Sequence, residues 1–111
     1  MPILIDLETS GEQIAGNITR KLIHLNNLMM AIVDFSDGPQ SEPELPHSHP
    51  HEQISYIAEG ELYVFIDGLK TQLKKGDMFS VPGGIPHCIQ MLSARVRIID
   101  SFSPLRNEFL Q

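Results

Sequence analysis

Two stretches decide the fold and the chemistry of this chain, and both are rich in histidine, proline and glycine. The first is PHSHPHEQISYIAEG at residues 46–60, and the second is GDMFSVPGGIPH at residues 76–87. In a β-strand, alternate residues share a face and lie about 6.6 Å apart, so the side chains of His47 and His49 can converge on one ion. The second stretch places His87 directly after a stiff Pro-Gly-Gly-Ile-Pro turn. The histidines of the two stretches are therefore candidate ligands of one metal ion.

Gln53 can join this site only if the chain turns after His49. Residues 47 and 53 would lie about 20 Å apart in an extended chain. Pro50 supplies a break, and a returning strand can begin near Gln53. His51 then lies on the turn, outside the group of metal ligands. The alternative interpretation is that the clustered histidines are simply a solvated loop.

Outside these stretches, the chain consists of short apolar runs separated by turns. Eight glycines and eight prolines fall between the runs, and Asp67-Gly68 is a strong hairpin signal. A helical turn could form over 12–21, although Gly16 weakens it, and another could follow Pro104. Turn signals every 8–12 residues or so favour an all-β sandwich or barrel. The predicted strands are 28–35, 53–58, 61–67, 69–73, 78–81, 87–92 and 95–102.

Length and charge limit the classes of function. The chain has 111 residues, enough for one domain. Its formal net charge of −6 and the lack of a basic block argue against binding to nucleic acid or to an anionic membrane. No apolar run approaches the roughly 20 residues of a membrane span. The first residues lack the basic start of a signal peptide, and the single cysteine suits a reducing compartment, so we expect a cytoplasmic location.

The C-terminal stretch RVRIIDSFSPLR, residues 95–106, carries a second signal. In a regular strand, every second residue from Val96 to Phe102 faces the interior, which brings Asp100 inside with the apolar side chains. An acid on an apolar face needs a partner or a functional role. One interpretation is a structural ion pair between Asp100 and Arg106, and the other is catalysis.

The two histidine-containing stretches resemble the two motifs of the cupin superfamily. The first motif has His-x-His, an acid or amide four residues later and a glycine seven further on; the second has Gly, then Pro-x-Gly, then His. The matching residues are His47, His49, Gln53 and Gly60, followed by Gly76, Pro82, Gly84 and His87. The resemblance implies a double-stranded β-helix, or jelly-roll barrel, over 21–111, preceded by an N-terminal segment at 1–20. It also implies a metal ion held by His47, His49, Gln53 and His87, and a homodimer.

Two positions depart from the cupin pattern. Gln53 stands where a glutamate ligand is usual, and Met91 stands where an asparagine is expected. Three neutral imidazoles and an amide would leave a divalent ion at +2, and such a centre attracts an anionic oxygen ligand. Three nitrogens and one oxygen suit a first-row transition metal with open positions. The cofactor expected is therefore one divalent ion among Zn, Ni, Mn, Fe and Cu.

The terminal pattern Asp-x-Phe-x-x-x-Arg narrows the resemblance to the KdgF group of pectin-degradation cupins. Members of that group linearise unsaturated monouronates released by pectin and alginate lyases. The resemblance implies catalytic roles for Asp100, Phe102 and Arg106 and a small anionic sugar acid as substrate. Two other functions stay open on the same scaffold. One is a non-catalytic sugar-binding or sensory cupin, and the other is a metal-dependent dioxygenase, which would give Asp100 and Arg106 no evident task.

Overall fold

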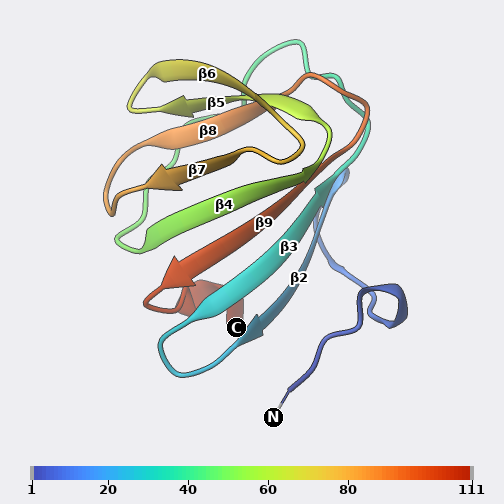
Figure 1. Ribbon diagram of the computed structural model, residues 1–111, viewed down its shortest axis with the longest axis vertical. Coiled ribbons are helices and arrows are strands. Elements are labelled where there is room, and N and C mark those ends of the chain that lie inside the picture. Colours follow the sequence, from blue (N-terminus) through green and yellow to red (C-terminus); the bar gives the residue numbers. More distant parts are fainter. Residues whose placement is uncertain (1, 111) are drawn as a thin grey trace.

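In the computed structural model, residues 2–110 are described, and they fold into two antiparallel sheets whose inner faces pack together (Figure 1). The larger sheet has the strand order β1-β2-β3-β9-β4-β7, and the smaller has the order β6-β5-β8. From β4 onward the chain passes repeatedly from one sheet to the other, which is the jelly-roll arrangement predicted from the sequence. The strands are β1 (Glu12–Ala15), β2 (Ile18–His24), β3 (Met29–Phe35), β4 (Glu52–Glu59), β5 (Glu61–Ile66), β6 (Leu69–Lys74), β7 (Met78–Val81), β8 (His87–Met91) and β9 (Val96–Ser103). Two 3-10 helices, η1 (Asp6–Glu8) and η2 (Asn107–Leu110), lie outside the sheets.

The strands predicted between residues 28 and 102 match the observed strands to within one residue at each end. The helical turn considered for 12–21 is wrong, because this segment forms β1 and β2. β2 pairs with β3 in unbroken register from Ile18 opposite Phe35 to His24 opposite Met29. The tertiary pairing partner therefore decides the conformation of a segment whose local pattern is ambiguous. The boundary drawn after residue 20 falls inside β2. The predicted turn after Pro104 is confirmed as η2.

The hydrophobic core occupies one end of the space between the sheets. Its members come from the end of β4, the start of β5, the end of β8 and the start of β9. Gly60 makes the tight connection between β4 and β5 with φ of +89°, and a Cβ at this position would collide with the carbonyl oxygen of Arg95. A glycine is therefore required where the first motif ends. The core residues are Ile57, Leu62, Val64, Met91, Val96 and Ile98.

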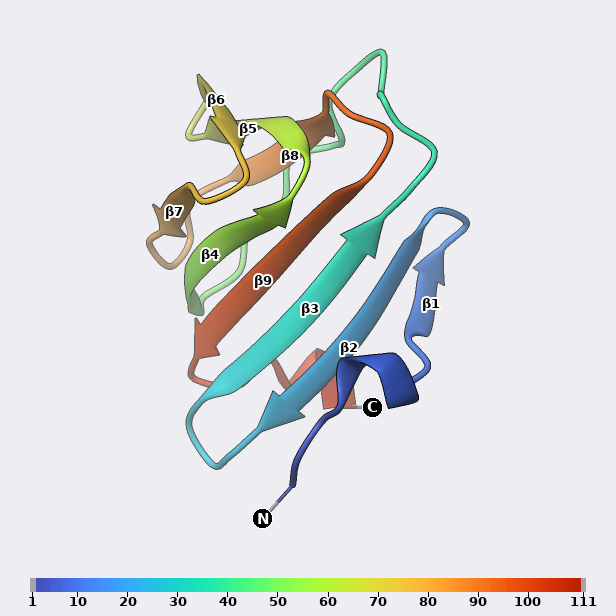
Figure 2. The same cartoon turned by 45° about the vertical axis from the view of Figure 1, so that its right-hand side comes forward.

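The opposite end of the interior is polar, because it gathers the start of β4, the start of β8 and the end of β9. His47 joins this end through an isolated bridge to His87, in which each backbone N–H donates to the other residue's carbonyl, at 3.0 and 2.9 Å. After β9 the chain turns back, and η2 lies against the sheet near β2 and β3 (Figure 2). The guanidinium carbon of Arg20 on β2 lies 3.7 Å from the centre of the Phe109 ring.

The outer face of the larger sheet carries an ionic cluster. Asp6 of η1 accepts hydrogen bonds from Lys21 of β2 and from Arg97 of β9, and Arg97 also binds Asp34 of β3. These contacts fasten the N-terminal segment across three neighbouring strands. Between residues 2 and 110, neither helix has the length and hydrophobicity needed to cross a bilayer.

Candidate functional site

Three histidine side chains converge at the polar end of the barrel. One ring nitrogen from each of His47, His49 and His87 lies within 4.8 Å of the other two. The bridge between His47 and His87 sets two of these side chains beside each other. The backbone N–H of Gly84 donates to the carbonyl of His49 at 2.7 Å, which ties the third to the turn of the second motif. The structure thus brings together the histidines of both motifs, and they could hold a metal ion.

In two of these rings, the hydrogen bonds use one nitrogen and leave the other with the lone pair that a metal needs. Nδ1 of His49 donates to the carbonyl of His51 at 3.0 Å, and Nδ1 of His87 donates to the carbonyl of Ile85 at 2.9 Å. Because a carbonyl only accepts, the proton of each ring is on Nδ1 and the lone pair is on Nε2. Nε2 of His87 is buried and has no hydrogen-bond partner among the described residues. Donation from the second ring nitrogen to a backbone carbonyl is typical of metal-binding histidines.

Gln53 turns its amide oxygen toward the histidines. Its Nε2 donates to Ser55 Oγ at 2.9 Å and to Asp100 Oδ1 at 3.4 Å, so its Oε1 is left 3.0 Å from Nε2 of His49. With Nδ1 of His49 protonated, this contact sets two lone pairs against each other. Ligand atoms that lie about 2.1 Å from one ion at right angles are themselves about 3.0 Å apart. A cation between the two atoms would therefore relieve the repulsion, and the four side chains fit a metal ion.

The local electrostatics favour the neutral imidazoles of His47 and His49. Burial lowers the pKa of His47 to about 4, and the positive charges that His87, His49 and Arg106 would present add to this effect. Burial also lowers the pKa of His49, and here the charge of Arg106 is the next cause. Metal ligands must be deprotonated, so this environment favours the ligand form of both rings.

Asp100 faces the same space from β9. Ser55 is its register partner on β4, and the Ser55 hydroxyl donates to Asp100 Oδ1 at 2.6 Å. Burial raises the pKa of the Asp100 carboxyl to about 6, against the opposing effects of the Ser55 hydrogen bond, the Arg106 charge and the Gln53 hydrogen bond. An acid whose pKa lies near neutrality can both give and take a proton.

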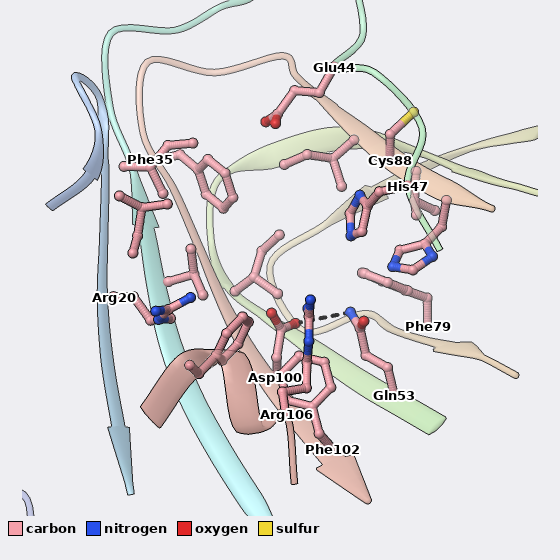
Figure 3. Close-up of a pocket in the computed structure, with 18 residues that line it drawn as sticks. Arg20, Phe35, Glu44, His47, Gln53, Phe79, Cys88, Asp100, Phe102 and Arg106 are labelled. Atoms are coloured by element: carbon pink, nitrogen blue, oxygen red, sulfur yellow. Dashed lines mark hydrogen bonds between the residues drawn. The ribbon is translucent and has the colours of Figure 1, made fainter. Parts of the chain in front are cut away.

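A cavity of about 170 Å³ opens beside these groups. All of the predicted site residues except His49 line it, and His49 packs edge-on against Phe102 with the ring centres 5.8 Å apart. Figure 3 shows Asp100 and Gln53 joined by their hydrogen bond near the base of the view, with His47 across from them. Arg106 reaches in from the segment after β9, and its guanidinium carbon lies 5.3 Å from the Phe102 ring centre and 4.2 Å from the Phe109 ring centre.

His51 is buried but lies outside the converging group, and its ring centre is 5.7 Å from that of His49. Some residues near the cavity were not predicted from the sequence, although Ser55 had a readable signal because it alternates with Gln53 and Ile57 on β4. The others had none, since they come from segments whose path was not predicted. The missed residues are Arg20, Glu44, Ser55 and Phe109.

Comparisons with known proteins agree with this geometry. Residues 32–102 match the family model described as a cupin domain. The pectin degradation protein KdgF of Dickeya dadantii is 39% identical over 108 residues, which cover 96% of each chain. The structure of KdgF from Halomonas sp. superposes with a TM-score of 0.88 at 31% identity and covers 98% of both chains. An RmlC-like cupin from Shewanella frigidimarina superposes with a TM-score of 0.85 at 34% identity, covering 96% of this chain and 93% of the other.

The family match spans more than half of the chain, and the similarity to KdgF runs over nearly all of it, including the N-terminal strands that the sequence motifs do not reach. One relationship accounts for the two histidine-containing motifs, the jelly-roll topology and the histidine cluster. The chain therefore belongs to the cupin family and is a homologue of the pectin degradation protein KdgF.

Proposed function

We propose that this protein linearises 4,5-unsaturated monouronates from pectin or alginate breakdown, by ring opening followed by ketonisation. The observation that carries the proposal is the convergence of three histidines beside a cavity lined by Gln53, Asp100 and Arg106, in a chain that is a KdgF homologue. The substrate is a small sugar acid, whose carboxylate suits the guanidinium of Arg106 in the cavity wall.

We assign the metal site to His47, His49, Gln53 and His87. Their neutral rings and amide oxygen suit one divalent ion of the first transition row, which is Zn, Ni, Mn, Fe or Cu. Bound there, the ion would supply a Lewis acid toward an anionic or carbonyl oxygen of the sugar. No redox step is required for linearisation.

The three predicted catalytic residues each have a different role toward the substrate. Arg106 binds the carboxylate, because a guanidinium matches a carboxylate with two parallel hydrogen bonds. Phe102 packs against the sugar and holds it beside Asp100. Asp100 moves a proton during ring opening and ketonisation, and its hydrogen bonds from Ser55 and Gln53 hold the carboxyl in place at the cavity wall.

The test is incubation of the metal-loaded protein with unsaturated galacturonate made by a pectin lyase. Loss of the absorbance of the 4,5 double bond, faster than in a sample without protein and faster than with Asp100→Asn, is the expected result. Equal rates in all three samples would exclude this catalytic function.

The same sample separates the two other functions. A dioxygenase would consume O₂ during turnover, whereas linearisation leaves dissolved O₂ unchanged. A sugar-binding or sensory cupin would bind the uronate without removing its double bond. An oxygen electrode and calorimetric titration distinguish these outcomes.

We further propose a homodimer that uses the outer face of the larger sheet. Met30 on β3 and Ile54 on β4 flank Ser101 of β9 in one row, and both are well exposed, at 48% and 60%. Met78 is also well exposed in the next row, beside the partly exposed Tyr56. Exposed apolar residues gathered on one sheet face are typical of an interface. A cytoplasmic location and the absence of nucleic-acid or membrane partners remain predictions from composition.

A further inference from the structure

Arg20 lines the cavity although nothing in the motifs points to it. It lies on β2, where its side chain is only 11% exposed, and one terminal nitrogen binds Glu12 at 3.2 Å. Its Nε is buried and has no hydrogen-bond partner among residues 2–110. A buried N–H of a charged group without an acceptor is costly, so this atom is suited to an oxygen that arrives with a ligand.

Arg20 and Arg106 share one aromatic support. Their guanidinium carbons lie 3.7 and 4.2 Å from the centre of the Phe109 ring, so the two cations are within about 8 Å of each other. Stacking on an aromatic ring orients the plane of a guanidinium. An anion bound beside both guanidiniums would be attracted by two positive charges at once.

The place of Arg20 in the sheet extends the site away from the metal ligands. β2 is separated from β4 by β3 and β9, so Arg20 and Gln53 lie on opposite sides of Asp100. Figure 3 shows the same order, with Arg20 across the cavity from Gln53 and with Asp100 and Arg106 between them. A group held near Arg20 therefore lies on the far side of Asp100 from Gln53.

We propose that Arg20 and Arg106 form a two-arginine subsite for the carboxylate of an acidic sugar, assembled around Phe109. This proposal rests on the proposed function for the identity of the sugar, but the subsite itself requires only an anionic ligand. Arg20 is then a binding residue that selects uronates over neutral sugars, and the carboxylate lies between the guanidiniums rather than on the metal. The ring carbons that react are held beside Asp100.

The experiment compares Arg20→Gln with the parent protein in two assays on metal-loaded samples. In turnover of unsaturated galacturonate, we expect KM to rise about 10- to 100-fold, as for loss of a charged hydrogen bond, while kcat changes less than threefold or so. In calorimetric titration with D-galacturonate, which has no double bond to react, the Kd should rise by a similar factor. D-galactose should bind weakly and equally to both proteins.

Arg95→Gln is the matched control, because it removes the same charge from an exposed position outside the cavity. It should leave KM and both Kd values unchanged. Arg20→Lys is the second variant, for the case in which Arg20→Gln fails to fold. Lysine keeps the positive charge but lacks the planar guanidinium edge. Arg20→Lys should therefore also raise KM while retaining the metal content and the melting temperature.

The two assays separate the two proposals. Turnover with an unchanged KM in both Arg20 variants would overturn the subsite and leave the proposed function standing. Absence of turnover in the parent, with D-galacturonate binding that depends on Arg20, would overturn the proposed function and support the subsite. A parent protein that binds D-galacturonate no better than D-galactose would overturn the subsite.

Discussion

Ser55 and Asp100 are register partners on β4 and β9, and a 2.6 Å hydrogen bond from the serine hydroxyl joins them beneath the cavity. The same hydroxyl accepts a hydrogen bond from Gln53 Nε2 at 2.9 Å. Ser55 therefore links the acid proposed for proton transfer to the amide proposed as a metal ligand. Because Ser55 is fully buried, a water molecule cannot take over the hydrogen bonds of its hydroxyl without local rearrangement.

Ser55→Ala should lower the free energy of unfolding by about 1–3 kcal/mol, because it leaves buried polar partners without their hydrogen bond. Urea denaturation of the metal-free protein measures this change. Ser80→Ala is the control, since Ser80 is an exposed serine on neighbouring β7 and should change stability by no more than about 0.5 kcal/mol. Equal effects of the two substitutions would show that the Ser55 hydroxyl contributes nothing specific.

Asp100→Asn should preserve bound metal and nearly all of the melting temperature, because asparagine still accepts the hydrogen bond from Ser55. Turnover of the unsaturated uronate should fall by about 10²–10⁴-fold, the usual contribution of general acid–base catalysis. The competing interpretation, a structural ion pair with Arg106, predicts a loss of about 3–5 kcal/mol in stability instead. Melting curves and initial rates on one preparation decide between them.

His49→Ala should lose the metal ion, whereas His51→Ala should keep most of it. The ring of His49 belongs to the converging group and that of His51 does not. Elemental analysis of the purified variants, dialysed against the same buffer, gives the metal content per chain. If His51→Ala loses as much metal as His49→Ala, the ligand set assigned above is incorrect.

The ionic cluster around Asp6 should make stability depend on pH in the acid range. Hydrogen bonds from Arg97 and then Lys21 lower the pKa of Asp6 from 3.8 to about 2. A lowered pKa in the folded state means that the stabilisation is complete above about pH 4 and is lost as the pH falls toward 2. Urea denaturation gives the free energy of unfolding at about pH 5 and at about pH 3. This free energy should fall less between the two pH values for Asp6→Asn than for the parent. An identical decrease in both proteins would contradict this role.

Light scattering at micromolar concentration should give a mass of about 25 kDa, twice the 12.4 kDa of one chain. Met30→Lys and Ile54→Lys place charges on the proposed interface and should shift the mass toward the monomer. Leu69→Lys, at a position 75% exposed on the smaller sheet, should leave the dimer intact. A parent protein that already measures near 12 kDa would exclude the dimer.

Most of the strands could be predicted from the sequence because their signals are local. Period-two alternation in 61–67 and the Asp67-Gly68 turn depend only on neighbouring residues, and both appear as predicted in β5 and β6. The segment at 12–21 could not be read in the same way, since its apolar residues fit neither period well. Its pairing with β3 is a contact distant in sequence, and that contact decides its conformation.

The sequence by itself determined the candidate metal ligands and which alternate residues of β9 face the interior. Motif spacing and strand alternation are local patterns, and they indicate which side chains share a face. Only the tertiary structure decided which faces meet. The register of β4 with β9 sets Ser55 against Asp100, and the return of η2 beneath β2 brings Phe109 into contact with both Arg20 and Arg106. These residues are separated by tens of positions in the chain, so no local pattern relates them. They come close together because two sheets bury their faces against each other. A sequence predicts such contacts only where the packing partners are already known.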